Sequence, residues 1–155
     1  MLSKTNRNRK YMDLAISMAS DRIGLTGSNP SVACVIVKNN KIISTGQTGI
    51  GGVPHAEADA INNSSEKVNG SILYVTLEPC SHYAKTPPCT KLIINSKIKK
   101  VFYSVNDIDT RSAGKSEEIF KNNKISCQKF LLKKRGLDLY NSYFHIKKRF
   151  TLCNR

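Results

Sequence analysis

The sequence predicts an α/β sandwich folded as one domain. Short apolar runs, typical of buried strands, alternate along the chain with segments whose apolar residues recur at helical spacing. A length of 155 residues is near the common size of one domain and is enough for a substantial core. No internal repeat and no Gly/Ser-rich linker divides the chain.

The first half of the chain predicts a helix followed by a β-hairpin. Apolar side chains recur at helical spacing over residues 10–23, which predicts a helix there. Two apolar runs, over residues 32–38 and 41–48, flank Asn39 and Asn40. Because asparagine favours tight turns, the two runs predict a hairpin.

The second half continues the alternation of helices and strands. We expect a helix beginning near His55, a strand over residues 71–76, a helix beginning near Cys89, a strand over residues 100–104, a short helix over residues 117–123 and a strand over residues 125–130. In α/β sheets, ligand sites lie beyond the carboxyl ends of strands. Residues 78–80 and 106–107 follow two of these strands and are therefore expected at a site.

Four residues suggest a metal centre. His55 and Glu57 form a His-x-Glu motif, which is followed by a Pro-Cys motif at Cys80 and by Cys89. This combination is the known signature of zinc-dependent base deaminases, so the match is to an established pattern. We expect His55, Cys80 and Cys89 to bind one Zn²⁺ per chain.

The number of ligands predicts a catalytic zinc site. Three protein ligands leave the fourth tetrahedral position open for water, whereas structural sites usually close it with a fourth Cys or His. Zinc can lower the pKa of bound water to about 7. Glu57 is then expected to act as the catalytic proton shuttle, first to a ring nitrogen and then to the departing amine.

A structural zinc site is the alternative reading of these residues. It would need a fourth ligand, for which His82 is a candidate. However, eight residues separate Cys80 from Cys89, and structural sites prefer two to four between paired ligands. The prolines at 54, 87 and 88 predict that His55 and Cys89 each lie in the first turn of a helix.

The segment between the cysteines narrows the family. Residues 78–89 read Glu-Pro-Cys-Ser-His-Tyr-Ala-Lys-Thr-Pro-Pro-Cys and closely resemble the riboflavin-pathway pyrimidine deaminases. The resemblance continues upstream in residues 28–37 and 51–57 and covers nearly the whole chain. It implies a cytidine-deaminase-like fold, which is a three-layer α/β/α sandwich with a mixed five-stranded sheet.

The resemblance also implies a reaction. In this family, water converts 2,5-diamino-6-(5-phosphoribosylamino)pyrimidin-4(3H)-one to 5-amino-6-(5-phosphoribosylamino)uracil and ammonia, the second step of riboflavin biosynthesis. By similarity, Asn29, His82, Lys85 and Thr86 would bind this substrate, with Lys85 at the phosphate. The alternative reading makes Thr86 a helix cap, Lys85 a solvated charge and Asn29 a turn residue.

A second substrate segment is expected at residues 106–116. Asp107, Asp109 and Gly114 match the family pattern, and the two aspartates are expected to bind the substrate by similarity. Two family prolines are replaced by Ile108 and Thr110, which predicts a less rigid loop. Further departures are Ser116, Ala33 and Ala84, each in place of a frequent family glycine.

The resemblance also bears on domain organisation and partners. Residues 1–150 are expected to form the deaminase domain, with a basic N-terminal start, and residues 133–155 resemble the linker to a reductase domain absent from this chain. Either a separate reductase acts on the product or the chain is truncated. The resemblance further suggests a homo-oligomer.

The charge of +14 suggests anionic partners. A phosphorylated substrate fits it, whereas the long cysteine insert argues against the alternative of a nucleoside, nucleotide or tRNA-adenosine deaminase and makes nucleic acid an unlikely partner. A non-catalytic binding protein on a deaminase scaffold is a third reading. Five cysteines without a signal peptide predict a cytoplasmic protein, and no apolar segment predicts a membrane span.

Overall fold

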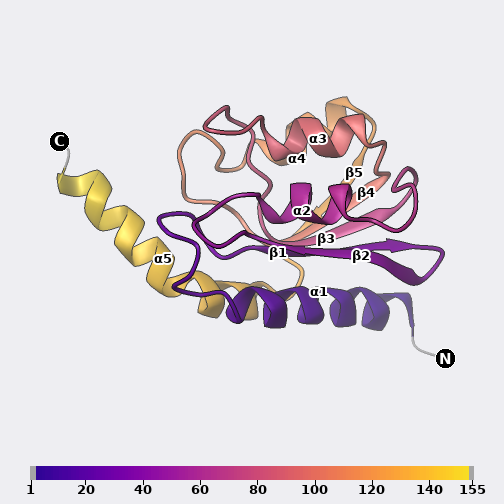
Figure 1. The fold of residues 1–155 in the computed structure, drawn as a ribbon, viewed down its shortest axis with the longest axis horizontal. Helices are drawn as coiled ribbons and strands as arrows, with labels where there is room; N and C mark the ends of the chain where they lie inside the picture. Colours follow the sequence, from indigo (N-terminus) through magenta and orange to yellow (C-terminus); the bar gives the residue numbers. More distant parts are fainter. Residues whose placement is uncertain (1–2, 154–155) are drawn as a thin grey trace.

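The computed structural model describes residues 3–153 as five helices and five strands (Figure 1). The elements are α1 (Lys4–Ser20), β1 (Ala33–Lys38), β2 (Lys41–Gln47), α2 (Ala56–Asn62), β3 (Ile72–Leu77), α3 (Cys89–Asn95), β4 (Lys100–Val105), α4 (Ser116–Asn122), β5 (Ser126–Lys129) and α5 (Lys133–Cys153). Nine of these ten elements correspond to helices and strands that the sequence predicts.

The strands form one mixed sheet in the order β2-β1-β3-β4-β5. β1 pairs antiparallel with both β2 and β3, whereas β3, β4 and β5 are parallel. The β1–β2 hairpin turns at Asn39 and Asn40, whose φ angles of 51° and 59° are both left-handed. Asparagine tolerates this conformation, which explains why this dipeptide can close the hairpin. The predicted mixed five-stranded sheet is confirmed.

Helices cover both faces of the sheet. Figure 1 shows α1 and the first part of α5 on one face and α2, α3 and α4 on the other. Alternate strand residues supply the two cores: Tyr74 packs with Met12 on the α1 face, and Val75 packs with Ala60 and Ile93 on the opposite face. The three-layer α/β/α sandwich is therefore confirmed.

The first helix has different ends from those predicted. It begins at Lys4, with Ser3 as N-cap accepting a hydrogen bond from the Asn6 N–H at 3.3 Å, and it ends at Ser20. The apolar stripe begins only at Tyr11 and Met12, so the polar first turns gave no periodic signal. The chain then leaves the helix through turns that include Gly24, whose φ is +85°.

The C-terminal helix α5 was not predicted from the sequence. The hydroxyl of Tyr140 donates a hydrogen bond to the Ser31 carbonyl at 2.8 Å, and Arg135 pairs with Asp13 of α1. At Gly136, an added Cβ would lie 2.2 Å from Ser104 Oγ, so glycine allows α5 to lie against β4. Residues 133–147 thus pack on the domain, while the end of α5 extends beyond the sheet (Figure 1). The last two residues of the predicted linker lie outside the described residues.

Candidate active site

Three predicted metal ligands lie together at the start of two helices. His55 is the N-cap of α2, Cys89 is the first residue of α3, and Cys80 lies in the loop after β3. One ligand atom from each residue lies within 4.8 Å of the other two. His55 Nδ1 is 3.3 Å from Cys89 Sγ and 3.7 Å from Cys80 Sγ.

Local backbone structure fixes the two cysteines. The N–H of Cys89 donates to Cys80 Sγ at 3.3 Å, and the N–H of Thr90 donates to the Cys80 carbonyl at 3.1 Å. Pro88 is the N-cap of α3, and Pro54 precedes the N-cap of α2. Cys89 therefore lies in the first turn of α3 as predicted, whereas His55 is the N-cap and lies one position before the first turn of α2.

The geometry and donor types fit zinc. A tetrahedral zinc with bonds of about 2.0 Å to nitrogen and about 2.3 Å to sulfur holds such ligands about 3.5 Å apart, close to the separations around His55 Nδ1. His82 is not part of this cluster. Its Nδ1 lies 2.7 Å from Ser112 Oγ, so the described residues do not support His82 as a fourth ligand.

The two cysteines of the cluster differ in how readily they lose a proton. A hydrogen bond from the Cys89 side chain is the main cause that lowers the pKa of Cys80 to about 4. The interaction with Cys80 and burial raise the pKa of Cys89 well above its ordinary value. Cys80 is therefore the sulfur that carries negative charge, and a bound divalent cation would favour the anionic form of both.

Glu57 lies beside this cluster in the first turn of α2. Its side chain is only 4% exposed, and burial raises its pKa to about 7. The negative charge of Cys80 acts in the same direction. A carboxyl group with this pKa can both accept and donate a proton near neutral pH, as acid–base catalysis requires.

A pocket of about 260 Å³ opens above the cluster. Nine of the ten predicted site residues line it, namely Asn29, His55, Glu57, Cys80, His82, Lys85, Thr86, Asp107 and Asp109. The tenth, Cys89, is buried beside Cys80. Residues predicted from separate parts of the sequence therefore meet in one cavity.

Two predicted substrate residues are held in place by hydrogen bonds. The amide nitrogen of Asn29 donates to the Gly52 carbonyl at 2.9 Å, and the Ser112 hydroxyl that contacts His82 also accepts from the Ser81 N–H at 3.1 Å. An added Cβ on Gly52 would lie 2.8 Å from the Asn29 amide nitrogen, so a larger residue there would displace Asn29. The Asn29 side chain is thus fixed against the backbone of Gly52, and its contact with the substrate stays a prediction.

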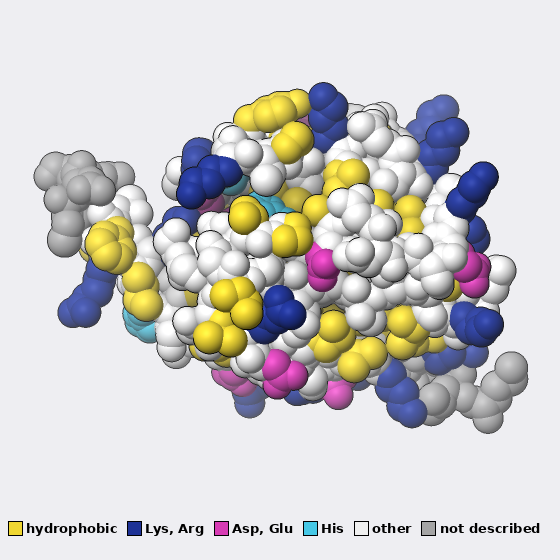
Figure 2. Space-filling model, viewed as in Figure 1, with side chains coloured by type: hydrophobic (Ala, Val, Ile, Leu, Met, Phe, Trp, Pro, Cys, Tyr) yellow, Lys and Arg dark blue, Asp and Glu magenta, His cyan; other side chains and the backbone are white. Residues whose placement is uncertain are grey.

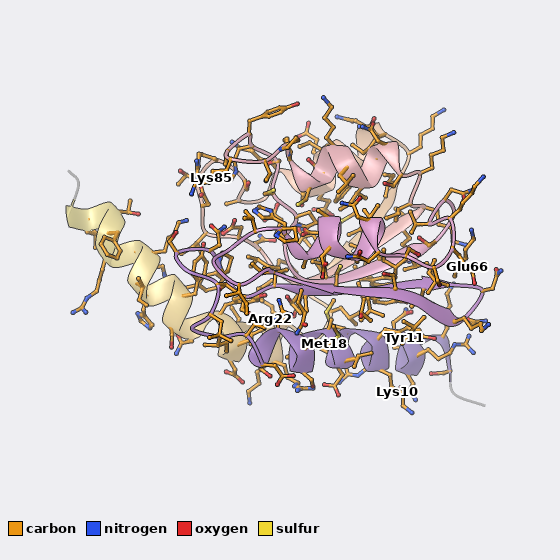
Figure 3. All side chains as sticks on the ribbon, viewed as in Figure 1. Lys10, Tyr11, Met18, Arg22, Glu66 and Lys85 are labelled. Carbon is orange, nitrogen blue, oxygen red and sulfur yellow. The ribbon has the colours of Figure 1, made fainter. Side chains whose placement is uncertain are left out.

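Lys85 and Thr86, two further predicted substrate residues, lie on the loop between the cysteines. Lys85 is exposed, at the opposite end of the molecule from Glu66 (Figure 3). Thr86 does not cap α3, because the N-cap is Pro88 and no side chain caps that end. The alternative role of Thr86 as a helix cap is therefore wrong.

The comparison with known proteins identifies the family of this chain. Residues 5–105 match the family described as "Cytidine and deoxycytidylate deaminase zinc-binding region". The chain belongs to this deaminase family. The deaminase is 40% identical to the "Diaminohydroxyphosphoribosylamino-pyrimidine deaminase" of Buchnera aphidicola subsp. Schizaphis graminum, over 89% of the chain and 94% of that protein.

Longer relatives point to the same branch of the family. The deaminase is 40% identical to the "Riboflavin biosynthesis protein RibD" of Aquifex aeolicus, over 88% of the chain but only 38% of that protein. The structure of Acinetobacter baumannii RibD, form 2, matches with a TM-score of 0.86 and 35% identity, over 91% of this chain and 40% of that chain. The chain thus corresponds to the deaminase part of RibD and spans about two fifths of the RibD proteins it matches.

A third comparison confirms the fold. The Thermotoga maritima diaminohydroxyphosphoribosylaminopyrimidine deaminase/5-amino-6-(5-phosphoribosylamino)uracil reductase matches with a TM-score of 0.85 and 35% identity, over 95% of this chain and 43% of that chain. The predicted cytidine-deaminase-like fold and the predicted resemblance to the riboflavin-pathway deaminases are both confirmed. Membership in this family makes the chain an enzyme, so the reading as a non-catalytic scaffold is not supported.

The buried Glu78 organises the loop that carries Asp107 in this deaminase. Its carboxylate accepts hydrogen bonds from the N–H groups of Asp107, Gly114 and Ser116 at 3.1, 3.0 and 3.2 Å. The departures at residues 33 and 84 bring no strain, because neither alanine has a positive φ. The sequence analysis included Glu78 in a motif but gave it no role of its own. Its position directly after a strand was the signal that could have indicated a place at the site.

Three further pocket residues were missed by sequence reasoning. Arg111 lies in the loop after β4, and Tyr143 and Lys147 lie on α5. Asp109 joins them: its carboxylate accepts two bonds from the Arg111 guanidinium, at 2.9 and 2.6 Å, and lies 3.5 Å from Lys147 Nζ. The Arg111 hydrogen bonds hold the pKa of Asp109 well below its usual range.

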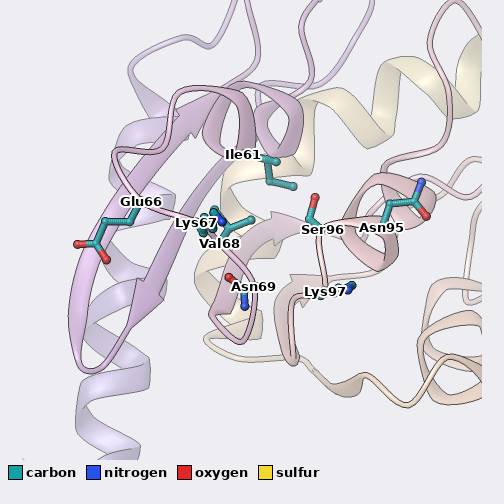
Figure 4. Close-up of a pocket in the computed structure, with 8 residues that line it drawn as sticks. All are labelled: Ile61, Glu66, Lys67, Val68, Asn69, Asn95, Ser96 and Lys97. Atoms are coloured by element: carbon teal, nitrogen blue, oxygen red, sulfur yellow. The ribbon is translucent and has the colours of Figure 1, made fainter.

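A second depression lies near the opposite ends of the parallel strands. Figure 4 shows its eight lining residues, which are Ile61, Glu66, Lys67, Val68, Asn69, Asn95, Ser96 and Lys97. Its volume of about 480 Å³ exceeds that of the site pocket, but it is a shallow surface feature. These side chains include no histidine or cysteine, so the deaminase chemistry belongs to the other pocket.

The surface carries its basic charge in several groups. On the face of the molecule that Figure 2 shows, Lys and Arg side chains are spread out, with acidic and apolar side chains between them. Among the helices described, none has the length and apolar character needed to cross a membrane.

Proposed function

We propose that this deaminase converts the diaminopyrimidine ribotide to the aminouracil ribotide and ammonia, in the second step of riboflavin biosynthesis. The observation that carries the proposal is the buried Glu57 beside the His55, Cys80 and Cys89 cluster, at the base of a pocket. The substrate follows from the relatives, because the Buchnera protein is named for this deamination and aligns over 94% of its length.

His55, Cys80 and Cys89 would hold one zinc ion per chain. When bound, zinc supplies Lewis acidity that makes a water molecule reactive near neutral pH. Glu57 accepts one proton from the attacking water and delivers it to the ring nitrogen beside the attacked carbon, and it then takes the remaining proton of the new hydroxyl group and delivers it to the leaving amino group. The carbon–nitrogen bond to that group breaks, a carbonyl group replaces it, and ammonia leaves. A Glu57 pKa of about 7 suits both transfers.

The other predicted residues would bind the substrate. Asn29 and His82 are held by hydrogen bonds and are suited to orient the pyrimidine. Lys85 and Thr86 lie on the loop that borders the pocket, and Asp107 and Asp109 line its side after β4. In the proposed complex, the carboxylates accept hydrogen bonds from ribose hydroxyls.

The proposal includes a partner and a compartment. The Thermotoga relative is named as both a deaminase and a uracil reductase, whereas the Buchnera relative is named as a deaminase alone. We therefore expect a reductase activity to act on the product, and we expect the deaminase to form a homo-oligomer. A cytoplasmic location would keep Cys80 and Cys89 reduced for metal binding.

A substrate panel tests the proposed function. The zinc-loaded protein should release ammonia from the diaminopyrimidine ribotide, with little release from cytidine, CMP or an adenosine-containing tRNA stem-loop. Activity restricted to the stem-loop or to CMP would instead support the nucleoside, nucleotide or tRNA-adenosine alternative.

A further inference from the structure

The outer end of the pocket is built from two segments that are distant in the sequence. Arg111 comes from the loop after β4, and Tyr143 and Lys147 come from α5, which passes that end of the sheet (Figure 1). Tyr143 and Lys147 lie outside the motifs that predicted the site, and Arg111 lies in the predicted substrate segment, residues 106–116, but was given no role there. Their place in the cavity raises the question of what part of a ligand they meet.

Exposure increases from the metal cluster toward these residues. Glu57 is 4% exposed, whereas the side chains of Lys147 and Arg111 are 37% and 58% exposed. A ligand whose reacting carbon lies at the cluster would therefore extend toward Lys147 and Arg111. In a ribotide, the group most distant from the ring is the phosphate.

The charges at this end of the pocket favour an anion. Arg111, Lys147 and Lys85 contribute three positive charges, and Asp107 and Asp109 contribute two negative ones, while Glu57 and Glu78 lie buried deeper in the pocket. Asp109 is shared between two of the cations, because Arg111 makes two hydrogen bonds to it and Lys147 makes one long ion pair. Lys147 and Arg111 keep donors that Asp109 does not use, and these can bind an anionic group of a ligand.

Lys147 is better positioned than Lys85 to bind that ligand. The Lys147 ammonium lies 5.6 Å from the centre of the Tyr143 ring one helical turn earlier, and the Tyr140 hydroxyl fixes this helix to β3 through Thr76 at 2.6 Å. The ion pair with Asp109, at 3.5 Å, uses at most part of its capacity of three donors. Lys85 is an exposed side chain on a loop and must lose more freedom on binding.

We propose that Lys147 is a specificity-determining residue that binds the phosphate of the ribotide, with Arg111 held beside it by Asp109. The inference rests on the proposed function for the identity of the substrate. It makes the middle of α5 a wall of the active site. It also assigns to Lys147 a larger share of phosphate affinity than to Lys85.

Steady-state kinetics of Lys147 variants test the inference. Lys147→Ala should raise KM for the ribotide roughly tenfold at similar kcat, because a charge-assisted contact to the bound substrate is lost. The same variant should leave KM for the dephosphorylated riboside nearly unchanged, and Lys147→Arg should restore most of the ribotide affinity. Lys148→Ala, which changes an exposed neighbouring lysine, is the matched control and should behave as wild type.

Several outcomes would overturn the assignment. If Lys147→Ala raised KM equally for the ribotide and the riboside, Lys147 would not bind the phosphate and would only hold α5 in place through Asp109. If Lys85→Ala raised KM for the ribotide, but not for the riboside, by more than Lys147→Ala does, Lys85 would be the main phosphate-binding residue. If Lys147→Ala unfolds, Lys147→Met keeps the aliphatic stem against Tyr143 while removing the charge, and the same criteria apply to it.

A binding measurement separates this inference from the proposed function. Ribose 5-phosphate is the probe, and its affinity is measured by calorimetry with wild type, Lys147→Met and Lys148→Ala. We expect roughly tenfold weaker binding in Lys147→Met alone. Wild type that binds the probe through Lys147 but does not deaminate the ribotide would refute only the proposed function. Equal affinity in all three proteins, or no binding to wild type, would refute the role of Lys147.

Discussion

Glu78 accepts two hydrogen bonds from Ser116, one from the backbone N–H at 3.2 Å and one from the hydroxyl at 2.9 Å. The sequence resemblance predicted a glycine at Ser116, and the serine hydroxyl present there adds a contact to the buried carboxylate. The two bonds join the end of β3 to the start of α4. They help to hold the loop that carries Asp107 and Asp109 against the pocket.

Glu78→Gln should destabilise the fold by about 2 kcal/mol, because an amide cannot accept all of the bonds that a buried carboxylate accepts. The check is the free energy of unfolding in urea. Ser116→Ala should cost about 1 kcal/mol, since the backbone bond stays. Glu118→Gln, at an exposed position of α4, is the control. Equal stability of the Glu78 and Glu118 variants would contradict a structural role for Glu78.

The position of α5 depends on the close approach of Gly136 to Ser104. Gly136→Ala should lower the melting temperature, because the new methyl group would meet Ser104 Oγ and Val105. Adding Ser104→Ala should recover part of that loss by removing the nearest atom. Thermal unfolding of the two single variants and the double variant gives the coupling between the sites. Strict additivity would mean that α5 does not pack against β4 as described.

The hydroxyl of Tyr140 gives a second test of the docking of α5. Tyr140→Phe should cost about 1–2 kcal/mol, because it removes the donor to the buried Ser31 carbonyl and the contact with Thr76. Tyr83→Phe is a suitable control, since Tyr83 is 66% exposed. A loss of stability no larger than in the control would show that these buried bonds are not made.

Much of the fold could be predicted from local sequence. The alternation of apolar runs identified all five strands, and the asparagine pair identified the hairpin. The end of α1 was misplaced because Ile23 fits the apolar spacing but lies, 57% exposed, beyond the helix. α5 was missed because residues 133–155 were interpreted as a linker from the family resemblance. Its apolar residues at helical spacing, which pack on the core, were the available signal: Leu139, Tyr140, Tyr143 and Phe144.

The residues of the candidate site likewise fall into those that local motifs predict and those that depend on tertiary packing. His55, Glu57, Cys80 and Cys89 belong to short motifs whose spacing indicates zinc chemistry, so the sequence placed them together. Tyr143 and Lys147 reach the pocket only because α5 packs across the sheet. No motif records such an approach between distant segments, so sequence reasoning assigned the phosphate to Lys85 alone.

Metal binding should depend on both cysteines of the cluster. Cys80→Ser and Cys89→Ser should each reduce bound zinc well below one per chain, and removal of zinc by a chelator should lower the melting temperature of wild type. Cys127→Ser is the control, because Cys127 lies on β5 outside the cluster. Metal content is measured by atomic emission on purified protein. Full zinc content in the Cys89 variant would remove that residue from the ligand set.

The ion pair of Asp109 should make part of the stability depend on pH. Arg111 holds the pKa of folded Asp109 below the usual value of about 3.9, so the stabilisation is present above that value and is lost as pH falls below it. The difference in urea midpoint between wild type and Asp109→Asn should be constant from about pH 7 to 5 and should shrink below about pH 4. A difference that grew on acidification would contradict the ion pair.

The most direct test of the central claim is ammonia release from the diaminopyrimidine ribotide, measured per bound zinc for wild type and Glu57→Gln side by side. We predict turnover by wild type and, in the variant, unchanged zinc with a loss of at least roughly a hundredfold in kcat, because the proton shuttle is gone. Substantial turnover by Glu57→Gln, or no ammonia from wild type with a full complement of zinc, would contradict the account.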